Sequence, residues 1–563
     1  MKDPSSALPS EPMSAEHWNA RGCALAAARD PAGARDAFAN GLKLAPKHVG
    51  LLSNFAQAAF EAADAPAAEQ AFRSAISLAP RHAPAYHGLS VLLRLQFRLD
   101  EAVESARFAV QLAPSYPIAH HNLGNVYMAQ GLVAQAITAY EQALSVDPRH
   151  RQSQGALLLA RLYVQGDDGA LMLQKHTEFA QVYAAPLAPE TRPHTNAPDP
   201  TRRLRVGYVS GDLRRHPVAF FVEPLLTHHD HAMVEPFIYS DVTSPDDTTA
   251  RLRALPVTWR DTRSASHSEL AEIIRADGID ILVDLAGHTG DNRLLTFARR
   301  PAPVQINYVG YPSTTGLDAI DYRLSDAWND PPDTTDAYCV EKLVRLPGGA
   351  WAFRPYDDAP PLVPSPVETL GQITFVSTNK IAKVTGAMLG LWREILLNTP
   401  TSRIIIATGG DRDGRARVLA GLQGIDPSRI LLPGRMSWQE YLNLYQQSDI
   451  LLDTYPHNGH TTTCDALWQG VAVVTLAGPT HCTRLGASVL SKLGLTDFIA
   501  TTPPQYVRIA TDLCAEARRL GELRSTMRSR IHQRGLTDGA RLAREIETAY
   551  RDMWRPWCAG KQS

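Results

Sequence analysis

The chain has 563 residues, a formal net charge of −2 and 44% hydrophobic residues, which fits roughly three or four globular domains. The near-neutral charge, without blocks of like charge, argues against a nucleic-acid-binding protein, and no apolar run approaches the ~18 residues that a membrane span needs. Six cysteines are scattered without close metal-type pairs, which predicts a cytoplasmic protein with no metal site.

A repeat of 34 residues follows a short lead-in, residues 1–14, which lacks the apolar core of a signal peptide and is expected to be disordered. Alanine, aromatic and leucine positions recur in phase with a proline, at Pro46, Pro80, Pro114 and Pro148. This pattern is typical of tetratricopeptide repeats, in which each unit is a helical hairpin that must stack on its neighbours. We therefore expect four such repeats over residues 15–148, and such arrays usually bind other proteins.

The pattern of apolar and polar residues changes after the repeats. Residues 149–200 are predicted to form a helical connector that ends in a proline-rich linker. From residue 201 onwards, short apolar strands alternate with helices over 201–365, and the alternation restarts over 366–535 after a second proline-rich linker. Each stretch predicts a doubly wound parallel sheet, and two such lobes predict a cleft in which ligands bind beyond the carboxyl ends of the strands. Residues 536–563 are expected to be a C-terminal helix and tail.

The segment DTYPHNGHTTTCDALWQGV (453–471) carries the richest candidate site. A strand and a tight loop lead into three threonines that open a helix, where free backbone N–H groups make a site for an anion. His460 adds a donor beside Thr461 and Thr462, and Asp465 is placed to accept hydrogen bonds from sugar hydroxyls. Ordinary helix capping by Thr461 or Thr462 is the alternative interpretation.

Two further junctions carry candidate residues. In TFVSTNKIAKVTGAM (374–388), Lys380 and Lys383 follow a strand and precede a helix, where a lysine suits a phosphate group. In RVGYVSGDLRRHPVAFF (205–221), His216 follows the first strand of the first lobe and would face Lys383 if the lobes face each other. Exposed surface lysines and a histidine that caps or packs are the alternatives, and for each residue taken alone they are favoured.

Together, these motifs resemble a known family. RVGYVSGDLRRHP, RPAPVQINYVGYPSTTG, STNKIAK and HNGHTTTCDALWQGV, in this order behind tetratricopeptide repeats, look like the O-linked N-acetylglucosamine transferases that act on Ser and Thr of proteins. The resemblance spans about residues 15–540. It implies a tetratricopeptide superhelix fused to an α/β GT-B fold with two Rossmann-like lobes. It further implies a UDP-N-acetylglucosamine donor, protein or peptide acceptors, and inverting transfer without metal or cofactor.

The resemblance also implies roles for individual residues. Lys383 matches the lysine that holds the donor's β-phosphate and stabilises the departing UDP, and His216 matches a histidine near the sugar and acceptor that has been proposed as the base. The other matches concern donor binding. His460, Thr461 and Thr462 match residues that bind the pyrophosphate, and Asp465 matches the aspartate that binds the ribose. Pro312 and Gly316 of the GYPSTTG loop match residues that line the sugar pocket, and Lys380 and Tyr441 are expected to lie near the donor.

The chain departs from the family pattern in two places. Tyr441 stands where the family usually has a histidine that stacks on uracil, and Trp438 stands where a lysine helps to hold the nucleoside. The inner groove of the repeats keeps half of the family's asparagine ladder, namely Asn54 and Asn122, which we expect to hold the acceptor. The altered base site leaves open a protein O-fucosyltransferase that uses GDP-fucose. A tetratricopeptide scaffold with a nucleotide-binding but weakly active GT-B domain is the non-enzymatic alternative.

Three other patterns of acidic residues or histidines have both a functional and a structural interpretation. Asp411 and Asp413 form a DxD sequence, the metal motif of a different glycosyltransferase fold, but its position beside glycines favours a plain turn. A cluster of histidines at 228, 229 and 231 is interpreted as a solvated helix end rather than a zinc site. His288 in LAGHTGDNR follows a strand of the first lobe and is expected to line the cleft.

Overall fold

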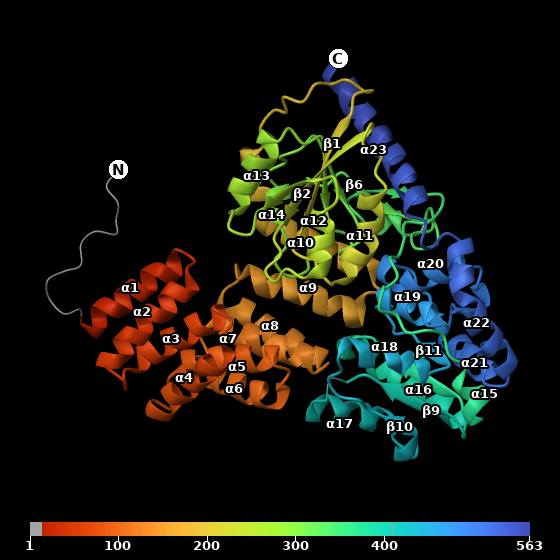
Figure 1. Ribbon diagram of the computed structural model, residues 1–563, viewed down its shortest axis with the longest axis horizontal. Coiled ribbons are helices and arrows are strands. Elements are labelled where there is room, and N and C mark those ends of the chain that lie inside the picture. The colour runs from red at the N-terminus through yellow and green to blue at the C-terminus, as the bar shows by residue number, and fades with distance from the viewer. Residues whose placement is uncertain (1–13, 409, 563) are drawn as a thin grey trace. The chain divides into compact units, whose positions relative to one another are not determined.

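The computed structural model describes residues 14–408 and 410–562, with side chains to residue 560 (Figure 1). The expected disorder of the lead-in therefore concerns residues that lie almost entirely outside the described part of the chain. The fold consists of two compact units: a helical unit of the residues up to 153 together with Asp411–Asp413, and a larger α/β unit that contains the rest from residue 154 onwards. No helix among the described residues combines the length and apolar character needed to cross a membrane.

The helical unit contains the predicted repeats as four antiparallel hairpins. Their helices are α1 (Ala15–Ala27), α2 (Pro31–Leu44), α3 (Val49–Glu61), α4 (Ala65–Leu78), α5 (Ala83–Leu95), α6 (Leu99–Leu112), α7 (Pro117–Ala129) and α8 (Val133–Val146). The second helix of each hairpin ends two residues before the repeat proline. Proline ends the helix there because it has no N–H for the helical hydrogen bonds.

Small residues pack against aromatic rings inside these hairpins, as the repeat pattern predicts. A Cβ atom added at Gly124 would lie 2.4 Å from the ring of Tyr140, and one added at Gly22 would lie 2.4 Å from the ring of Phe38. Both rings are almost fully buried. A larger residue at either glycine would therefore push the two helices apart.

The two expected ladder asparagines each bridge to the preceding hairpin. The Asn54 amide nitrogen donates to the Asn19 side-chain oxygen at 2.9 Å, and the Asn122 amide lies 2.6 Å from Nδ1 of His87. Both asparagines are half-buried. Their observed role is to join neighbouring repeats, and their role toward an acceptor stays a prediction.

The α/β unit begins with a helical connector made of α9 (Arg151–Gln165), α10 (Gly169–Tyr183) and the 3₁₀ helix η1 (Ala185–Glu190). A first lobe follows, with seven parallel strands in the order β3-β2-β1-β4-β5-β6-β7. The strands are β1 (Leu204–Ser210), β2 (Val234–Ser240), β3 (Thr258–Asp261), β4 (Ile281–Asp284), β5 (Val304–Asn307), β6 (Tyr322–Ser325) and β7 (Lys342–Arg345). The helices and the 3₁₀ turn between them are α11 (Pro217–Thr227), α12 (Asp247–Arg253), α13 (His267–Ala276), α14 (Leu294–Phe297) and η2 (Asp336–Tyr338).

The second lobe has a six-stranded parallel sheet in the order β10-β9-β8-β11-β12-β13. Its strands are β8 (Thr374–Ser377), β9 (Arg403–Ile406), β10 (Ile430–Leu431), β11 (Ile450–Leu452), β12 (Ala472–Leu476) and β13 (Ile499–Ala500). Its helices are α15 (Pro366–Leu370), α16 (Gly386–Asn398), α17 (Arg412–Gly421), α18 (Trp438–Gln446), α19 (Thr461–Trp468), α20 (Leu485–Lys492), α21 (Pro503–Leu513) and α22 (Ala517–Gln533). Four 3₁₀ turns complete it: η3 (Ile381–Lys383), η4 (Pro427–Arg429), η5 (His481–Thr483) and η6 (Thr496–Phe498).

The predicted fold class is confirmed: tetratricopeptide hairpins precede two doubly wound lobes. In each sheet the strand order reverses at the first strand of the lobe: β1 lies between β2 and β4, and β8 lies between β9 and β11. Helices therefore cover both faces of each sheet. Buried apolar residues of the two lobes form one continuous cluster, which includes Trp351 and Phe353 of the segment that joins the lobes. The lobes are therefore held together by a shared core.

The last helix, α23 (Gly539–Gln562), returns to the first lobe and packs on α11 and β5 (Figure 1). His229 anchors it, because its ring nitrogens lie 2.8 Å from a carboxylate oxygen of Glu547 and 2.7 Å from the hydroxyl of Tyr208. The interpretation of this histidine as part of a solvated helix end was wrong, since His229 is buried. A carboxylate that lies far along the sequence explains its burial, and no local pattern contains that information.

Candidate functional site

The start of α19 exposes backbone N–H groups at the carboxyl edge of the second sheet. The preceding loop is fixed by Asp453, whose side chain accepts hydrogen bonds from the backbone N–H of Gly459 at 2.7 Å and of Thr454 at 2.8 Å. His460 is the N-cap residue, but its side chain makes no capping hydrogen bond. Within the described residues, the N–H groups of the first helical turn have no acceptor. This is the geometry of an anion site.

The threonine hydroxyls do not cap this helix, so the capping interpretation does not account for them. The Thr462 hydroxyl donates to the side-chain oxygen of Asn379 at 3.0 Å, and the Thr463 hydroxyl donates to the carbonyl of Gly459 at 3.2 Å. Thr461 and Thr462 are half-buried at the helix start. The helix end is therefore left open for a ligand to complete.

Lys383 reaches the loop that precedes α19. Its ammonium donates to the carbonyl oxygen of Asn458 at 2.9 Å. Burial lowers the pKa of Lys383 to about 8, so the side chain still carries its charge at neutral pH. Lys380, three residues earlier, is exposed. The structure thus brings a partly desolvated positive charge close to an open helix N-terminus.

His216 is the N-cap residue of α11, and its Nδ1 accepts a 3.4 Å hydrogen bond from the backbone N–H of Val218. Burial lowers its pKa, the charges of Lys380 and Arg214 lower it further, and Asp212, at 3.7 Å, opposes them. The imidazole is therefore neutral at pH 7 and able to take up a proton. The lysine whose charge acts on His216 is Lys380 rather than Lys383.

His460 packs against two aromatic residues that precede the second lobe in the sequence. Its ring stacks on Phe221 with centroids 4.1 Å apart and meets the edge of Trp351 at 4.4 Å. Burial lowers its pKa to about 3, and no described group accepts from or donates to its Nε2. His460 is therefore a neutral imidazole whose position depends on both lobes.

Asp465 is buried in a ring of tyrosines. One of its oxygens accepts from the hydroxyl of Tyr356 at 2.7 Å, and the other accepts from the hydroxyl of Tyr441, also at 2.7 Å. Burial raises the pKa of Asp465 to about 7, against the effect of these hydrogen bonds. The Tyr441 ring stacks on Trp438 with centroids 5.4 Å apart, and Tyr356 meets the edge of Trp438 at 4.5 Å. Tyr441 and Trp438, the two departures from the family pattern, thus form one aromatic surface beside Asp465.

The GYPSTTG loop divides into two environments. Pro312 is half-buried and lines a small cavity together with Thr480 and His481. Gly316 instead has a φ of +73° and lies under α10, where an added Cβ would approach the backbone of His176 to 2.4 Å. His288 is also packed there, since it is buried and its Nε2 lies 2.7 Å from the Thr315 carbonyl oxygen. The structure therefore places His288 in packing rather than on an open cleft wall.

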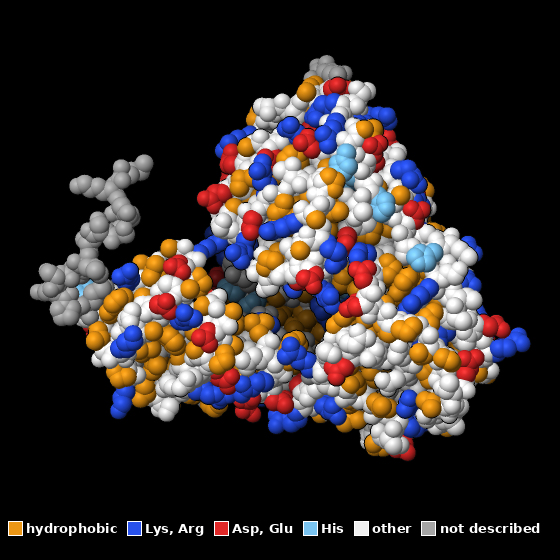
Figure 2. Space-filling model, viewed as in Figure 1, with side chains coloured by type: hydrophobic (Ala, Val, Ile, Leu, Met, Phe, Trp, Pro, Cys, Tyr) orange, Lys and Arg blue, Asp and Glu red, His pale blue; other side chains and the backbone are white. Residues whose placement is uncertain are grey.

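The DxD sequence lies at the start of α17, with Asp413 in its first turn. Across residues 14–408 and 410–562, no group of three or more His, Cys, Asp or Glu side chains is arranged to hold a metal ion. On the face shown in Figure 2, basic and acidic side chains are interspersed over the α/β unit.

Comparison with known proteins identifies the family. A model of glycosyl transferase family 41 matches residues 163–351 and 369–546, and tetratricopeptide repeat models match residues 53–117 and 117–150. The chain belongs to glycosyl transferase family 41. The gap between the two matched ranges contains Tyr356, a partner of Asp465.

Relatives of this family 41 protein include a rice (Oryza sativa subsp. japonica) protein named probable UDP-N-acetylglucosamine–peptide N-acetylglucosaminyltransferase SPINDLY. It is 38% identical over 434 residues, which are 75% of this chain and 46% of the rice protein. The Arabidopsis thaliana protein of the same type named SEC is 30% identical over 64% of this chain and 38% of its own length. The chain thus spans about half the length, or less, of these curated relatives.

Among solved structures, a variant of the Thermobaculum terrenum O-GlcNAc transferase matches the family 41 protein with a TM-score of 0.84. The two are 35% identical, and the match covers 91% of this chain and 98% of the Thermobaculum chain. The similarity therefore includes the repeats as well as the two lobes. Asn458, Tyr356 and Phe221 are site residues that sequence reasoning missed. Of these, Asn458 and Phe221 lie in quoted motifs without an assigned role.

Proposed function

We propose that the chain is an inverting glycosyltransferase that moves N-acetylglucosamine from UDP-N-acetylglucosamine to Ser and Thr hydroxyls of proteins. The observation that supports the proposal is that the Lys383 ammonium contacts the loop that leads into the open N-terminus of α19. As the bond from sugar to phosphate breaks, negative charge gathers on the departing UDP. An ammonium and aligned N–H groups stabilise that charge without a metal ion.

The acceptor hydroxyl must lose its proton as it attacks the sugar. His216 is neutral at pH 7 and lies at the start of α11 in the first lobe, so we assign it as the group that takes the proton. His460, Thr461 and Thr462 bind the pyrophosphate, and Asp465 with Tyr441 and Trp438 surrounds the nucleoside. Pro312 borders the sugar, and Lys380 adds positive charge at the entrance. In this proposal the reaction needs no cofactor.

The acceptor is a protein or peptide segment that the repeats hold through the groove carrying Asn54 and Asn122. The names of the relatives, which describe peptide N-acetylglucosaminyltransferases, support this choice of acceptor. All six cysteines are unpaired, which supports action in the reducing cytoplasm.

The test is to incubate the purified chain with UDP-N-acetylglucosamine and a Ser/Thr peptide library and to measure UDP release and peptide mass. A gain of one N-acetylhexosamine per modified peptide, abolished in Lys383→Met, is the expected result. GDP-fucose is tested beside it, and transfer from GDP-fucose alone would replace the donor assignment. Tight UDP binding without transfer from either donor would favour the scaffold alternative.

A further inference from the structure

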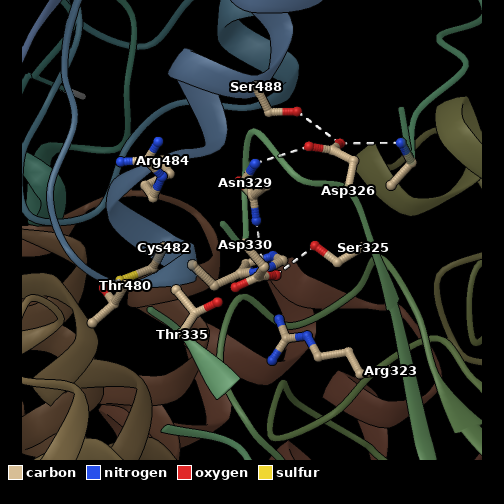
Figure 3. Close-up of polar contacts among 12 residues, drawn as sticks. Arg323, Ser325, Asp326, Asn329, Asp330, Thr335, Thr480, Cys482, Arg484 and Ser488 are labelled. Atoms are coloured by element: carbon tan, nitrogen blue, oxygen red, sulfur yellow. Dashed lines mark hydrogen bonds and ion pairs between the residues drawn. The ribbon is translucent and has the colours of Figure 1, made fainter. Parts of the chain in front are cut away.

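The carboxylate of Asp326 ties together three segments of the α/β unit. Its Oδ1 accepts hydrogen bonds from the backbone N–H groups of Trp328 at 3.0 Å and Asn329 at 2.8 Å, in the turn after β6. Its Oδ2 accepts from the hydroxyl of Ser488, on α20 of the second lobe, at 2.8 Å and from the backbone N–H of Ala350 at 3.1 Å. Figure 3 shows this carboxylate between Ser488 and Asn329. Asp326 is 1% exposed, so these four donors rather than water satisfy it.

Ser488 passes this contact on to Trp351, which lies in the segment that joins the lobes. The indole N–H of Trp351 donates to the Ser488 hydroxyl oxygen at 3.1 Å, and that hydroxyl donates to Asp326. The direction is fixed, because an indole N–H can only donate, whereas a hydroxyl both accepts and donates. Trp351 and Ser488 are also buried, so a lost hydrogen bond leaves a buried polar group unpaired. Indole, hydroxyl and carboxylate thus form one relay, the Trp351 relay, which crosses between the lobes.

Two further rings support the indole of Trp351. The His481 ring lies roughly perpendicular to it, with centroids 6.4 Å apart, and the Tyr308 ring lies nearly parallel to it, with centroids 6.1 Å apart. His481 is itself fixed, since its Nδ1 lies 2.6 Å from Asp330 Oδ2 and 2.6 Å from the side-chain amide of Asn329. The indole is therefore held at its N–H and along its ring by residues outside α19 and outside the loop before it.

Trp351 in turn forms a wall for His460, the N-cap residue of α19. The two ring centroids lie 4.4 Å apart, while Phe221 stacks on His460 with centroids 4.1 Å apart. The His460 side chain makes no capping hydrogen bond, and its buried Nε2 has no partner in the described part of the chain. Packing against these two rings therefore fixes the imidazole. Because the N-cap residue precedes the first free N–H groups of its helix, its position bears directly on the anion site.

A purely structural interpretation of the Trp351 relay is that it only holds the lobes together. That interpretation predicts that loss of the relay lowers stability but leaves the affinity of the folded chain for UDP unchanged. A positioning role predicts that UDP affinity falls even where the chain is fully folded. The arrangement favours positioning, because the relay ends at an indole that packs on His460, a side chain that depends on packing for its place.

We propose that Asp326 and Ser488 are positioning residues for the donor site: through Trp351 they hold His460, and with it the start of α19, in the geometry that receives the pyrophosphate. This inference rests on the proposed function. The side chains of Asp326 and Ser488 hydrogen-bond to each other, to Trp351 and to backbone outside α19, so their effect on UDP passes through the indole. Loss of the Ser488 hydroxyl leaves the indole N–H unpaired and lets the ring shift. A small shift of a binding group is enough to slow turnover.

The experiment is a double-mutant cycle between Ser488 and His460 on the full chain. UDP affinity is measured by titration calorimetry at a temperature well below the melting transition of every variant. In Ser488→Ala, affinity falls roughly fivefold or more, and Ser488→Thr, which keeps a hydroxyl, recovers most of it. In a His460→Ala background, Ser488→Ala costs nothing further, because the ring that the relay positions is gone. Ser491→Ala, at a half-buried serine of the same helix, is the matched control and leaves affinity unchanged.

Trp351→Phe is the second variant and serves where Ser488→Ala fails to fold. It keeps an aromatic wall and removes the indole N–H, so it weakens UDP binding when His460 is present and has no effect in the His460→Ala background. Equal losses in both backgrounds, or no loss in a folded relay variant, would overturn the positioning role and leave the relay as a stabilising contact. Failure of the wild-type chain to bind UDP would instead remove the proposed function, and the positioning role with it.

Discussion

The ammonium of Lys383 and the carbonyl oxygen of Asn458 lie 2.9 Å apart, which joins the turn after β8 to the loop before α19. An ammonium has three donors, and this contact uses one of them. The lysine is therefore positioned by the protein before any ligand arrives. A charge that is already in place loses little energy to rearrangement when a phosphate develops negative charge.

Replacing Lys383 with Met should slow sugar transfer by roughly 10²-fold or more, because one transition-state electrostatic partner is lost. UDP binding should weaken by a smaller factor, since the open helix N-terminus remains. Steady-state kinetics and UDP titration measure the two effects. Lys342→Met, at an exposed lysine of β7, is the control and should behave as wild type. Near-native transfer by Lys383→Met would contradict the assigned role.

UDP affinity should fall with rising pH as Lys383 loses its proton. Burial sets the pKa of this lysine at about 8 in the free protein, so it is charged below that pH and neutral above it. His216 and His460 have lowered pKa values and are already neutral over this range. We expect affinity to drop roughly fivefold or more between about pH 7 and 9.5. Lys383→Arg, which keeps its charge, should lose this drop and show only the smaller change that comes from Asp465, whose pKa is about 7.

Sugar transfer should survive chelation. Lys383 and the N-terminus of α19 supply the positive field that a divalent cation supplies in many nucleotide-sugar enzymes. The measurement is initial rate after extensive dialysis against EDTA, with and without added Mn²⁺ or Mg²⁺. Complete loss that either ion restores would make Asp411 and Asp413 metal ligands and remove the metal-free mechanism.

Asp465 should make stability depend on pH in an unusual direction for a carboxylate. Its pKa is about 7 when folded and roughly 3.9 when unfolded, so the folded chain keeps a proton that the unfolded chain releases between these values. The stabilising contribution is complete below about pH 4 and is lost as pH rises through 7, by at most about 1.4 kcal/mol per pH unit.

Thermal unfolding between pH 5 and 8 checks this effect. The Asp465→Asn variant has no titrating group at this position. The difference between its melting temperature and that of the wild type should therefore shift in favour of the variant as pH rises. Asp318→Asn, at an exposed aspartate, is the control and should show a constant difference. A constant difference for Asp465→Asn as well would mean that the carboxylate is ionised throughout.

Deleting residues 1–148 should separate donor binding from acceptor binding. Every donor-binding candidate lies in the α/β unit, so UDP affinity should stay within a few-fold. Transfer to protein acceptors should fall much further, because the groove with Asn54 and Asn122 is gone. Folding of the truncated chain must be verified first by circular dichroism. A folded truncation with full activity on proteins would remove the recognition role of the repeats.

The repeats and most strands were predictable because their signals are local. A 34-residue period fixes the hairpins, and apolar runs such as LRVGYVS mark the buried strands. The strands β3, β6, β7 and β13 were not predicted. Polar residues interrupt TWRD, YRLS and KLVR, and β13 is only two residues long. Such strands are recognised only once a neighbour in the sheet supplies their hydrogen bonds.

The site divides in the same way. Lys383, His216 and the start of α19 were predictable because each stands at a strand–helix junction. Tyr356, one of the two partners of Asp465, was not, because it lies 109 residues away in sequence. The stacking of Phe221 on His460 similarly joins two lobes. Contacts of this kind depend on how the lobes pack, and no motif within either lobe encodes them.

The return of α23 to the first lobe means that no uninterrupted stretch of the gene encodes that lobe. The strands of its sheet are complete by Arg345, yet a helix that packs on α11 and β5 is translated only after the whole second lobe. On the ribosome, the second lobe is therefore synthesised, and free to fold, before the first has received its final helix. A fragment that stops at the linker between the lobes contains an incomplete first lobe. A fragment that also carries residues 539–562 on a new linker regains the helix that covers α11 and β5.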